Sequence, residues 1–344
     1  MSATASGGPI RVMQSFRAPR ATTNPYITML DNALGESHEV VHLRFDWRGA
    51  LVGRYDVFHW HWPEGKLHGS TWWRTAGKCA LTAALWLRLR LSRRIAVVRT
   101  VHNVELPDDG RMRTALLARI ERDADLLIVL NSATRVGDRP SALIPHGHYR
   151  DWYAAQPRAD RVRGRIGAFG GVRRYKNVSV LVDAYADAAR RRPELSLEIG
   201  GRPSTPELGR NLEQRAQQLP NVDLQLRFLP DGELVRLATQ SELVVLAYRF
   251  MHNSGSVLAA LSLDRPVLVP RNPVNEALAR EVGERWVHMY DGELHGDQLL
   301  AALSVVAEIP EGSQPDLRRR DWQRAAADHA AAYRRALTVK RGRA

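Results

Sequence analysis

Four short segments of the chain place polar side chains directly after apolar, strand-like runs. In parallel α/β sheets, ligands bind in the crevice outside the carboxyl ends of the strands, so these segments are candidate sites. The first is a glycine turn that contains Gly171, Arg173 and Lys176. Glycine lets backbone N–H groups approach an anion, and the two basic residues can neutralise a pyrophosphate. The alternative is an ordinary glycine turn with exposed basic side chains, because the segment matches neither the G-x-G-x-x-G motif nor a Walker loop.

The second segment follows an apolar run and precedes a predicted helix. It contains five candidate residues: His252, Asn253, Ser254, Gly255 and Ser256. Asn or Ser caps the helix, and Gly255 leaves the first N–H groups of the helix open to a phosphate. The alternative is an ordinary N-cap, which every helix needs.

The third segment ends a predicted strand. Alternation along a strand predicts that His59 and His61 share one face while Trp60 and Trp62 share the other. Aromatic rings, imidazoles and the carboxylate of Glu64 suit a sugar site, because rings stack on a pyranose and polar groups take its hydroxyls. A structural tryptophan cluster is the alternative. Zinc is disfavoured, because the pair of histidines has no third ligand at a familiar spacing.

The fourth segment follows a run of β-branched residues. This run delivers His102 and Asn103 to the end of a strand, and the loop adds three carboxylates, Asp108 among them. The same pattern also fits a buried histidine followed by a turn asparagine, so both interpretations stay open.

Composition is typical of a folded α/β protein: 344 residues, 44% hydrophobic and 25% charged. The single cysteine, Cys79, cannot form an intramolecular disulfide, which favours a reducing compartment. The first residues lack the layout of a signal peptide. The apolar run near Cys79–Leu87 is far shorter than the roughly 20 residues that span a bilayer. We therefore expect a cytoplasmic protein.

The net charge of +13 invites a nucleic-acid or anionic-membrane interpretation. Only four of the 50 basic residues are lysine: Lys66, Lys78, Lys176 and Lys340. The choice of lysine at position 176 therefore indicates that the glycine turn requires a compact charge there. No acid lies between Glu64 and Glu105, and this basic stretch is rich in leucine and tryptophan. A helix lying on anionic lipid through residues 66–99 would explain the pattern, and so would an ordinary buried helix ending in a basic turn.

Short β-branched runs alternate with helical stretches along the whole chain, which predicts two doubly wound parallel sheets in series. We expect one domain over residues 1–150, a linker over 151–163, a second domain over 164–316, and a C-terminal helix and basic tail over 317–344. The expected strands are Ile10–Gln14, Glu39–Leu43, Asp56–His59, Ile95–Val101, Leu126–Leu130, Ala142–Ile144, Arg165–Phe169, Ser196–Ile199, Asp223–Arg227, Leu243–Ala247 and Pro266–Val269. The expected helices include Pro25–Leu34, Trp72–Leu91, Met112–Arg122, Val178–Arg191, Pro206–Gln218, Gly232–Thr239, Ser254–Leu263, Asn275–Val282 and Leu317–Ala336.

This order resembles the glycosyltransferases of the GT-B architecture, in which two Rossmann-like domains face a central cleft. The glycine turn matches the basic phosphate-binding loop of that family, and the segment from Leu243 to Pro270 matches its donor unit. Several motifs resemble, more closely, the bacterial β-mannosyltransferases of the xanthan type, which build lipid-linked exopolysaccharide repeats. These motifs are His61-Trp62-Pro63-Glu64, Val101-His102-Asn103, Ile144-Pro145-His146-Gly147-His148-Tyr149, Tyr175-Lys176-Asn177 and Asn253-Ser254-Gly255-Ser256.

The resemblance implies a nucleotide-sugar donor, with GDP-mannose favoured, held by the second domain, and its base near Phe228 and Leu229. It implies an acceptor glycan, free or linked to a polyprenyl diphosphate, on the first domain. The lipid-linked acceptor would be met at the inner face of the plasma membrane. The commonest retaining GT-B family has paired glutamates where this chain has Met251 and Ala259. That departure favours an inverting relative. Arg173, Lys176 and the helix start near Ser254–Ser256 would stabilise the leaving group without a metal ion, and we expect no cofactor.

An inverting transferase needs a general base on the acceptor side. Glu64 is our first candidate, His61 and His102 follow, and Asp108 comes last. Three rival functions remain. A sugar-nucleotide epimerase or hydrolase would use the same donor residues, and the missing glutamates also fit a catalytically idle GT-B partner subunit. A nucleic-acid-binding protein is disfavoured, because no recognition module is visible and the basic stretch is too rich in leucine.

Overall fold

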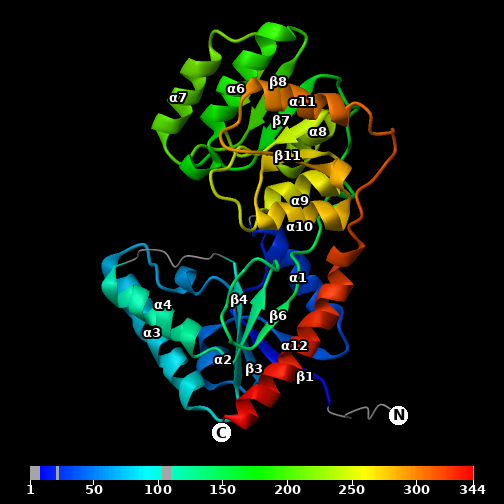
Figure 1. Cartoon of the computed structure of the whole chain (residues 1–344). Helices are drawn as coiled ribbons and strands as arrows, with labels where there is room; N and C mark the ends of the chain where they lie inside the picture. Colours follow the sequence, from blue (N-terminus) through cyan, green and yellow to red (C-terminus); the bar gives the residue numbers. More distant parts are fainter. Residues whose placement is uncertain (1–7, 21–22, 103–109, 344) are drawn as a thin grey trace, which may run out of the picture. The chain divides into compact units, whose positions relative to one another are not determined.

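Two six-stranded parallel sheets form the framework of the chain (Figure 1). The computed structural model describes residues 8–20, 23–102 and 110–343. Unit 1 comprises Met1–Gly147 and Arg319–Ala344, and unit 2 comprises His148–Arg318. The expected tail over 317–344 is therefore not a separate piece. Its helix packs on the sheet of unit 1, and the expected linker over 151–163 belongs to unit 2.

Sheet A, in unit 1, has the strand order β2-β1-β3-β4-β5-β6 with every pair parallel. Its strands are β1 (Ile10–Gln14), β2 (Val40–Leu43), β3 (Val57–Trp60), β4 (Ala96–Val101), β5 (Leu126–Val129) and β6 (Ser141–Leu143). The order reverses between β1 and β3, which are in register at Gln14 and His59. In open α/β sheets such a switch point is where ligands bind.

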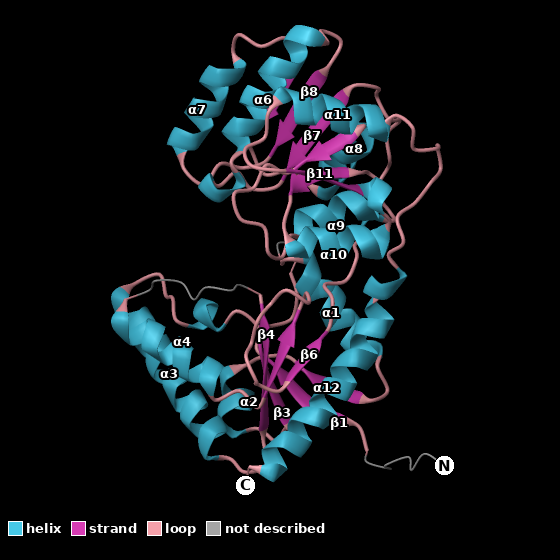
Figure 2. Cartoon of the chain, viewed as in Figure 1, coloured by secondary structure: helices cyan, strands magenta, loops and turns pink. Residues whose placement is uncertain are grey.

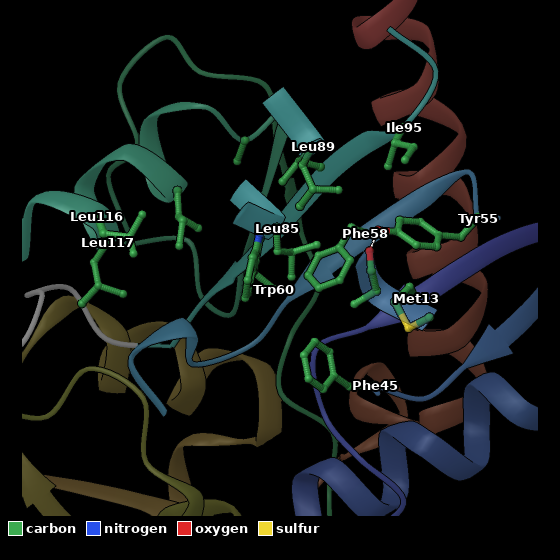
Figure 3. Packing of buried hydrophobic residues seen from close by; sticks show 14 of the residues in the cluster. Met13, Phe45, Tyr55, Phe58, Trp60, Leu85, Leu89, Ile95, Leu116 and Leu117 are labelled. Atoms are coloured by element: carbon green, nitrogen blue, oxygen red, sulfur yellow. Dashed lines mark hydrogen bonds between the residues drawn. The ribbon is translucent and has the colours of Figure 1, made fainter. Parts of the chain in front are cut away.

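Helices cover both faces of sheet A (Figure 2). They are α1 (Pro25–Glu36), α2 (Trp47–Val52), α3 (Trp72–Leu91), α4 (Arg111–Arg122) and α12 (Trp322–Gly342), with the 3-10 turn η1 (Pro63–Lys66) after β3 and η4 (Arg318–Arg320) at the unit boundary. A large apolar cluster lies under α2, α3 and α4, and Figure 3 shows Phe58, Trp60, Leu85 and Leu89 packed within it. On the other side, α12 packs against β4, β5 and α1.

Sheet B, in unit 2, has the order β12-β11-β10-β7-β8-β9, again parallel throughout. Its strands are β7 (Arg165–Phe169), β8 (Ser196–Gly200), β9 (Val222–Gln225), β10 (Leu243–Val245), β11 (Val267–Pro270) and β12 (Val287–Tyr290). This is the dinucleotide-binding strand order, and its switch point lies between β7 and β10.

The helices of unit 2 are α5 (Arg150–Tyr153), α6 (Val178–Arg191), α7 (Pro206–Ala216), α8 (Asp231–Gln240), α9 (Gly255–Ser262), α10 (Pro273–Val282) and α11 (Gly296–Val306), with 3-10 turns η2 (Arg174–Lys176) and η3 (Glu284–Trp286). Helix α6 packs against both α7 and α11, and α8 lies on β7 and β8. Across the described ranges of both units, every helix is too short or too polar to cross a membrane.

Most expected elements are confirmed, several with identical ends, among them β1, β7, α3 and α6. The last helix is the main error, since it runs over Trp322–Gly342 and not over Leu317–Ala336. Asp321 caps this helix by accepting from the N–H groups of Gln323 and Arg324, which fixes its start. Helices α2, α5 and α11 and strand β12 were not expected.

Candidate active site

The expected donor site lies within unit 2, at the switch point of sheet B. The glycine turn follows β7, and the segment over Arg249–Ser256 follows β10, the neighbouring strand. Register pairs Phe169 with Gly200 on the other side of β7, so Gly170 and Gly201 are also neighbours. The carboxyl ends of these strands therefore bring together the first two segments that the sequence singled out.

Glycine is required at position 170 by its backbone. Gly170 has φ +96°, a region that side chains other than glycine rarely adopt. A Cβ built there would lie 3.0 Å from the Lys176 Nζ and 3.2 Å from the Ser256 Oγ. The bare backbone, the ammonium and the hydroxyl thus meet at one point, and each can contact a bound anion.

Lys176 is held at this point by an aromatic ring. Its Nζ lies 5.1 Å from the centroid of the Tyr248 ring, and the Tyr248 hydroxyl is 3.3 Å from the Ser256 Oγ. The N–H of Arg249 donates to the carbonyl of Tyr175 at 2.9 Å, which ties the two segments together. Arg173 is exposed beside them.

Helix α9 begins directly after these residues. Ser254 is its N-cap and accepts from the N–H of Val257 at 3.3 Å. A Cβ on Gly255 would lie 3.1 Å from the Tyr149 hydroxyl, so glycine keeps the first turn open beside that ring. His252 and Asn253 lie partly exposed just before the cap. The first N–H groups of α9 and its dipole favour an anion at this end.

The segment expected to meet the nucleotide base follows β9. Phe228 is 73% exposed, whereas Leu229 is only 7% exposed. A Cβ on Gly200 would lie 2.3 Å from the Cδ1 of Leu229, so that leucine fills the space above the end of β8. Of the two residues, Phe228 is therefore the one whose side chain is exposed and available to contact a ligand.

The expected acceptor site lies within unit 1, at the switch point of sheet A, where the third segment follows β3. His59 and His61 share a face, as predicted, with ring centroids 4.0 Å apart. The face of the second tryptophan was predicted wrongly. Trp62 has φ +43°, which turns its ring away from buried Trp60 and stacks it on His102 at 3.5 Å between centroids.

His61 and His102 contact each other, with 3.1 Å between the Nδ1 of His61 and the Nε2 of His102. His61 is only 3% exposed, and the backbone N–H of His61 donates to the Ser15 Oγ at 2.7 Å. Burial holds the pKa of both imidazoles well below 6.5, and neighbouring histidines lower it further. Both rings are therefore neutral near pH 7.

Glu64 lies in η1, directly after Trp62 and Pro63, and its side chain is partly exposed. Glu64 follows β3, one of the two strands that form the switch point of sheet A. Asn103 and Asp108 lie outside the described residues. Within the described ranges, no three His, Cys, Asp or Glu side chains are grouped so that they could hold a metal ion.

Two curated proteins from Xanthomonas campestris pv. campestris are similar to this chain over nearly its whole length. Both are GDP-mannose:glycolipid 4-beta-D-mannosyltransferases, each 41% identical over 329 residues, or 95% of this chain and 93% of the relative. The chain belongs to the glycosyltransferase family of these mannosyltransferases. No family model matches it.

Solved structures agree with the fold of this glycosyltransferase. The Anabaena protein HepE, solved with UDP and glucose, covers 97% of the chain and 98% of its own length, with a TM-score of 0.59 and 14% identity. AviGT4, a glycosyltransferase involved in avilamycin A biosynthesis, covers 96% of the chain and 98% of its own length, with a TM-score of 0.59 and 17% identity. The expected GT-B architecture is confirmed by these matches and by the two parallel sheets.

Sequence reasoning missed the residues that surround the histidines of this glycosyltransferase. The Tyr333 hydroxyl, from α12, lies 2.8 Å from the His59 Nδ1, and the Gln14 amide donates to the same hydroxyl at 2.9 Å. His329, one turn before Tyr333, lies 5.8 Å from the His59 ring. The spacing of His329 and Tyr333 along one face of α12 indicated that both are buried. The local sequence held no sign that this face packs against β3.

The two positions that lack glutamate are buried in this glycosyltransferase. Met251 is 7% exposed, and its Sδ lies 3.4 Å from the Asn275 amide nitrogen. Ala259 lies buried within α9. A carboxylate at either position would need different neighbouring side chains. This chain therefore differs from the retaining pattern in the packing around the two positions as well as in the two residues.

Proposed function

We propose that the chain transfers mannose from GDP-mannose to a hydroxyl of a glycolipid, with inversion and without a metal ion. The observation that carries the proposal is 41% identity, over 95% of the chain, to enzymes named for that donor and that class of acceptor. GDP-mannose carries its sugar as the α-anomer, and the name of the relatives specifies a β-linked product. A single displacement at the anomeric carbon accounts for that change.

Unit 2 supplies the groups that stabilise the leaving nucleotide. As the bond between the anomeric carbon and the diphosphate oxygen breaks, negative charge grows on the GDP. Lys176, Arg173 and the first N–H groups of α9 neutralise that charge, and Gly170 lets the phosphates approach the backbone. Phe228 offers its exposed ring to the guanine.

Unit 1 supplies the groups that act on the acceptor. The acceptor oxygen forms the new bond to the anomeric carbon, and its proton passes to the carboxylate of Glu64. His61 is almost fully buried, so we assign it to positioning, together with the stacked pair of Trp62 and His102. The exposed part of this edge then binds the sugar that carries the reacting hydroxyl.

Helix α3 is the surface that we assign to the membrane. An ordinary buried helix would hide its apolar residues, yet Trp72 is 82% exposed and Trp73 is 55% exposed. Leu87 and Leu91 are exposed as well, and arginines lie between them. Helix α3 therefore combines apolar contact with positive charge, as a peripheral helix on anionic lipid does. The end of the stretch over 66–99 is not part of this surface, because Arg99 is buried in β4 and pairs with Glu121. Sedimentation with anionic but not neutral vesicles is expected, and equal, negligible sedimentation with both would remove this assignment.

The transfer is tested with a panel of sugar nucleotides. The protein is incubated with GDP-mannose, UDP-glucose or dTDP-glucose, with and without a lipid-linked glycan, and both released nucleotide and mannosylated lipid are measured. Of the three donors, we expect only GDP-mannose to give product, and only when the acceptor is present. NMR should show a β linkage, and a chelator should not reduce the yield. Nucleotide release that ignores the acceptor would instead support the hydrolase or epimerase alternative.

A further inference from the structure

Three basic side chains gather in unit 1 beside the candidate base. They are Arg17 in the loop after β1, Lys66 in η1, and Lys78 in the first half of α3. We call them the cationic cluster. Both lysines belong to the four in the whole chain, and neither is needed for the donor chemistry described above.

The ring of Phe45 supports the centre of this cluster. The Lys66 Nζ lies 3.8 Å from the centroid of the Phe45 ring. The N–H of Phe45 donates to the carbonyl of Phe16 at 2.8 Å, so the loop that carries Arg17 runs beside the same ring. Lys66 is thereby fixed over an aromatic face, and Arg17 is brought to it from another strand end.

Hydrogen bonds hold the segment after Lys66 against α3. The Gly69 N–H donates to the Thr75 Oγ1 at 3.0 Å, the Cys79 Sγ to the Leu67 carbonyl at 3.6 Å, and the Lys78 ammonium to the His68 carbonyl. The third bond places Lys78 at the turn that follows Lys66. The two lysines therefore lie near each other at the carboxyl edge of sheet A.

The charges in this cluster oppose one another. Partial burial lowers the pKa of Lys66 to about 8, and the nearby positive charges of Arg17 and Lys78 act in the same direction. No acid follows along the chain until Glu105. Like charges held together cost free energy, and an anionic ligand removes that cost.

We propose that the cationic cluster binds an anionic group carried by the acceptor glycolipid, either a phosphate of the lipid carrier or a carboxylate of an acidic sugar. The inference rests on the proposed function. The N–H of Leu67 donates to the carbonyl of Glu64 at 3.0 Å, so candidate base and cluster share one tight turn. An anion bound here fixes the acceptor close to the carboxylate that takes its proton, which orients the reacting hydroxyl.

Chemical labelling of the lysines tests the cluster without relying on activity. The protein is acylated with a limiting amine reagent at pH 8, and mass spectrometry reports the labelling of Lys66, Lys78, Lys176 and Lys340 separately. Lys340, which pairs with Asp125 at 3.6 Å, is the internal reference. Three acceptors are compared: one with a diphosphate lipid and neutral sugars, one with an alkyl chain and an acidic sugar, and one with an alkyl chain and neutral sugars.

We expect the acceptor that carries the recognised anion to protect Lys66 and Lys78, and the neutral acceptor to leave them labelled. Whichever anionic acceptor protects identifies the source of the anion. No protection by either, equal protection by the neutral acceptor, or protection by anionic phospholipid vesicles alone would overturn the proposal. GDP is expected to protect Lys176 only, so failure at Lys176 counts against the proposed function and failure at Lys66 counts against this inference.

Kinetics of matched variants provide a second readout. Lys66→Gln and Arg17→Gln each remove one charge from the cluster, and Arg94→Gln removes one from the exposed far end of the same acid-free stretch. Loss of one charged contact should raise the KM for the anionic acceptor about 10-fold or more, without a matching change in the KM for GDP-mannose. An equal effect of Arg94→Gln would show that only overall charge matters, and that result would contradict a specific site.

Discussion

At the scale of single residues, the proposed donor site depends on a lysine, Lys176, in a chain whose other basic residues are mostly arginine. Lys176 reaches the space above Gly170, where a Cβ would already lie 3.0 Å from its Nζ. A guanidinium is planar and larger than an ammonium, so it does not fit this point in the same way. In the proposed reaction, the compact ammonium on its flexible side chain follows the phosphate as the bond to the sugar breaks.

Lys176→Gln is expected to lower kcat/KM for GDP-mannose by about 100-fold, because one preorganised cation at the leaving group is lost. The matched control is Arg174→Gln, since Arg174 lies in the same turn, two residues before Lys176, but extends toward Glu207 with 3.7 Å between charged atoms. Steady-state kinetics and a melting curve separate the effect from misfolding. Equal losses in the two variants would remove Lys176 from the donor site.

Glu64→Gln keeps the shape of the side chain and removes its basicity. If Glu64 accepts the acceptor proton, kcat falls by roughly 10²–10⁴-fold while the KM for GDP-mannose changes little. Single-turnover measurements at saturating substrates check this directly. Near-normal turnover would show that the base lies elsewhere, and residues 103–109 would be the next place to search.

At the scale of elements, helix α12 completes unit 1 from the far end of the sequence. Its docking requires a very close approach: a Cβ on Gly147 would lie 2.3 Å from the Trp322 ring. The Arg320 guanidinium also donates to the carbonyl of His146 at 3.1 Å. Glycine at position 147 is therefore a packing requirement of α12 rather than a turn requirement.

Gly147→Ala should destabilise the protein by about 2–4 kcal/mol, because the methyl group forces Trp322 out of its place. Gly35→Ala is the control. Gly35 lies on the exposed side of α1 with open space around it, so alanine there should be neutral or add up to about 1 kcal/mol. Urea unfolding of both variants checks the contrast, and similar midpoints would contradict the packing argument.

At the scale of the whole molecule, the buried histidines make stability depend on pH. Burial lowers the pKa of His146 and of His329 to about 4, and that of His59, His61 and His102 well below 6.5. The unfolded chain binds protons at these rings near pH 6.5, whereas the folded chain does not. The contribution of His146 and His329 is therefore complete above about pH 6.5 and is lost as the pH falls toward 4, and the other three rings act in the same direction.

His329→Gln should flatten this dependence by about 1.4 kcal/mol per pH unit between pH 6.5 and 4, because one such ring no longer titrates. His38→Gln, the same substitution at an exposed position, is the control for the chemical change itself. Urea unfolding at several pH values measures both slopes. Parallel curves for wild type and His329→Gln would show that His329 is not buried in its neutral form.

The sequence by itself determined the order of strands and helices along the chain, because periodicity and capping are local. It also placed Lys176, the start of α9 and the His59–Glu64 segment at strand ends, where ligands bind in parallel sheets. Family motifs then indicated the class of transferase. Motifs of this kind lie within single loops, so they can be recognised in the sequence before the fold is known.

Only the tertiary structure decided which strand ends lie side by side, since the local sequence of a parallel strand does not show which strands it pairs with. It placed Gly170 against Ser256 and brought His329 and Tyr333 to His59. It also turned Trp62 from the side of Trp60 onto His102 through one left-handed residue. These contacts join residues far apart in the chain, and their free energy comes from burial that exists only after the sheets and α12 have assembled.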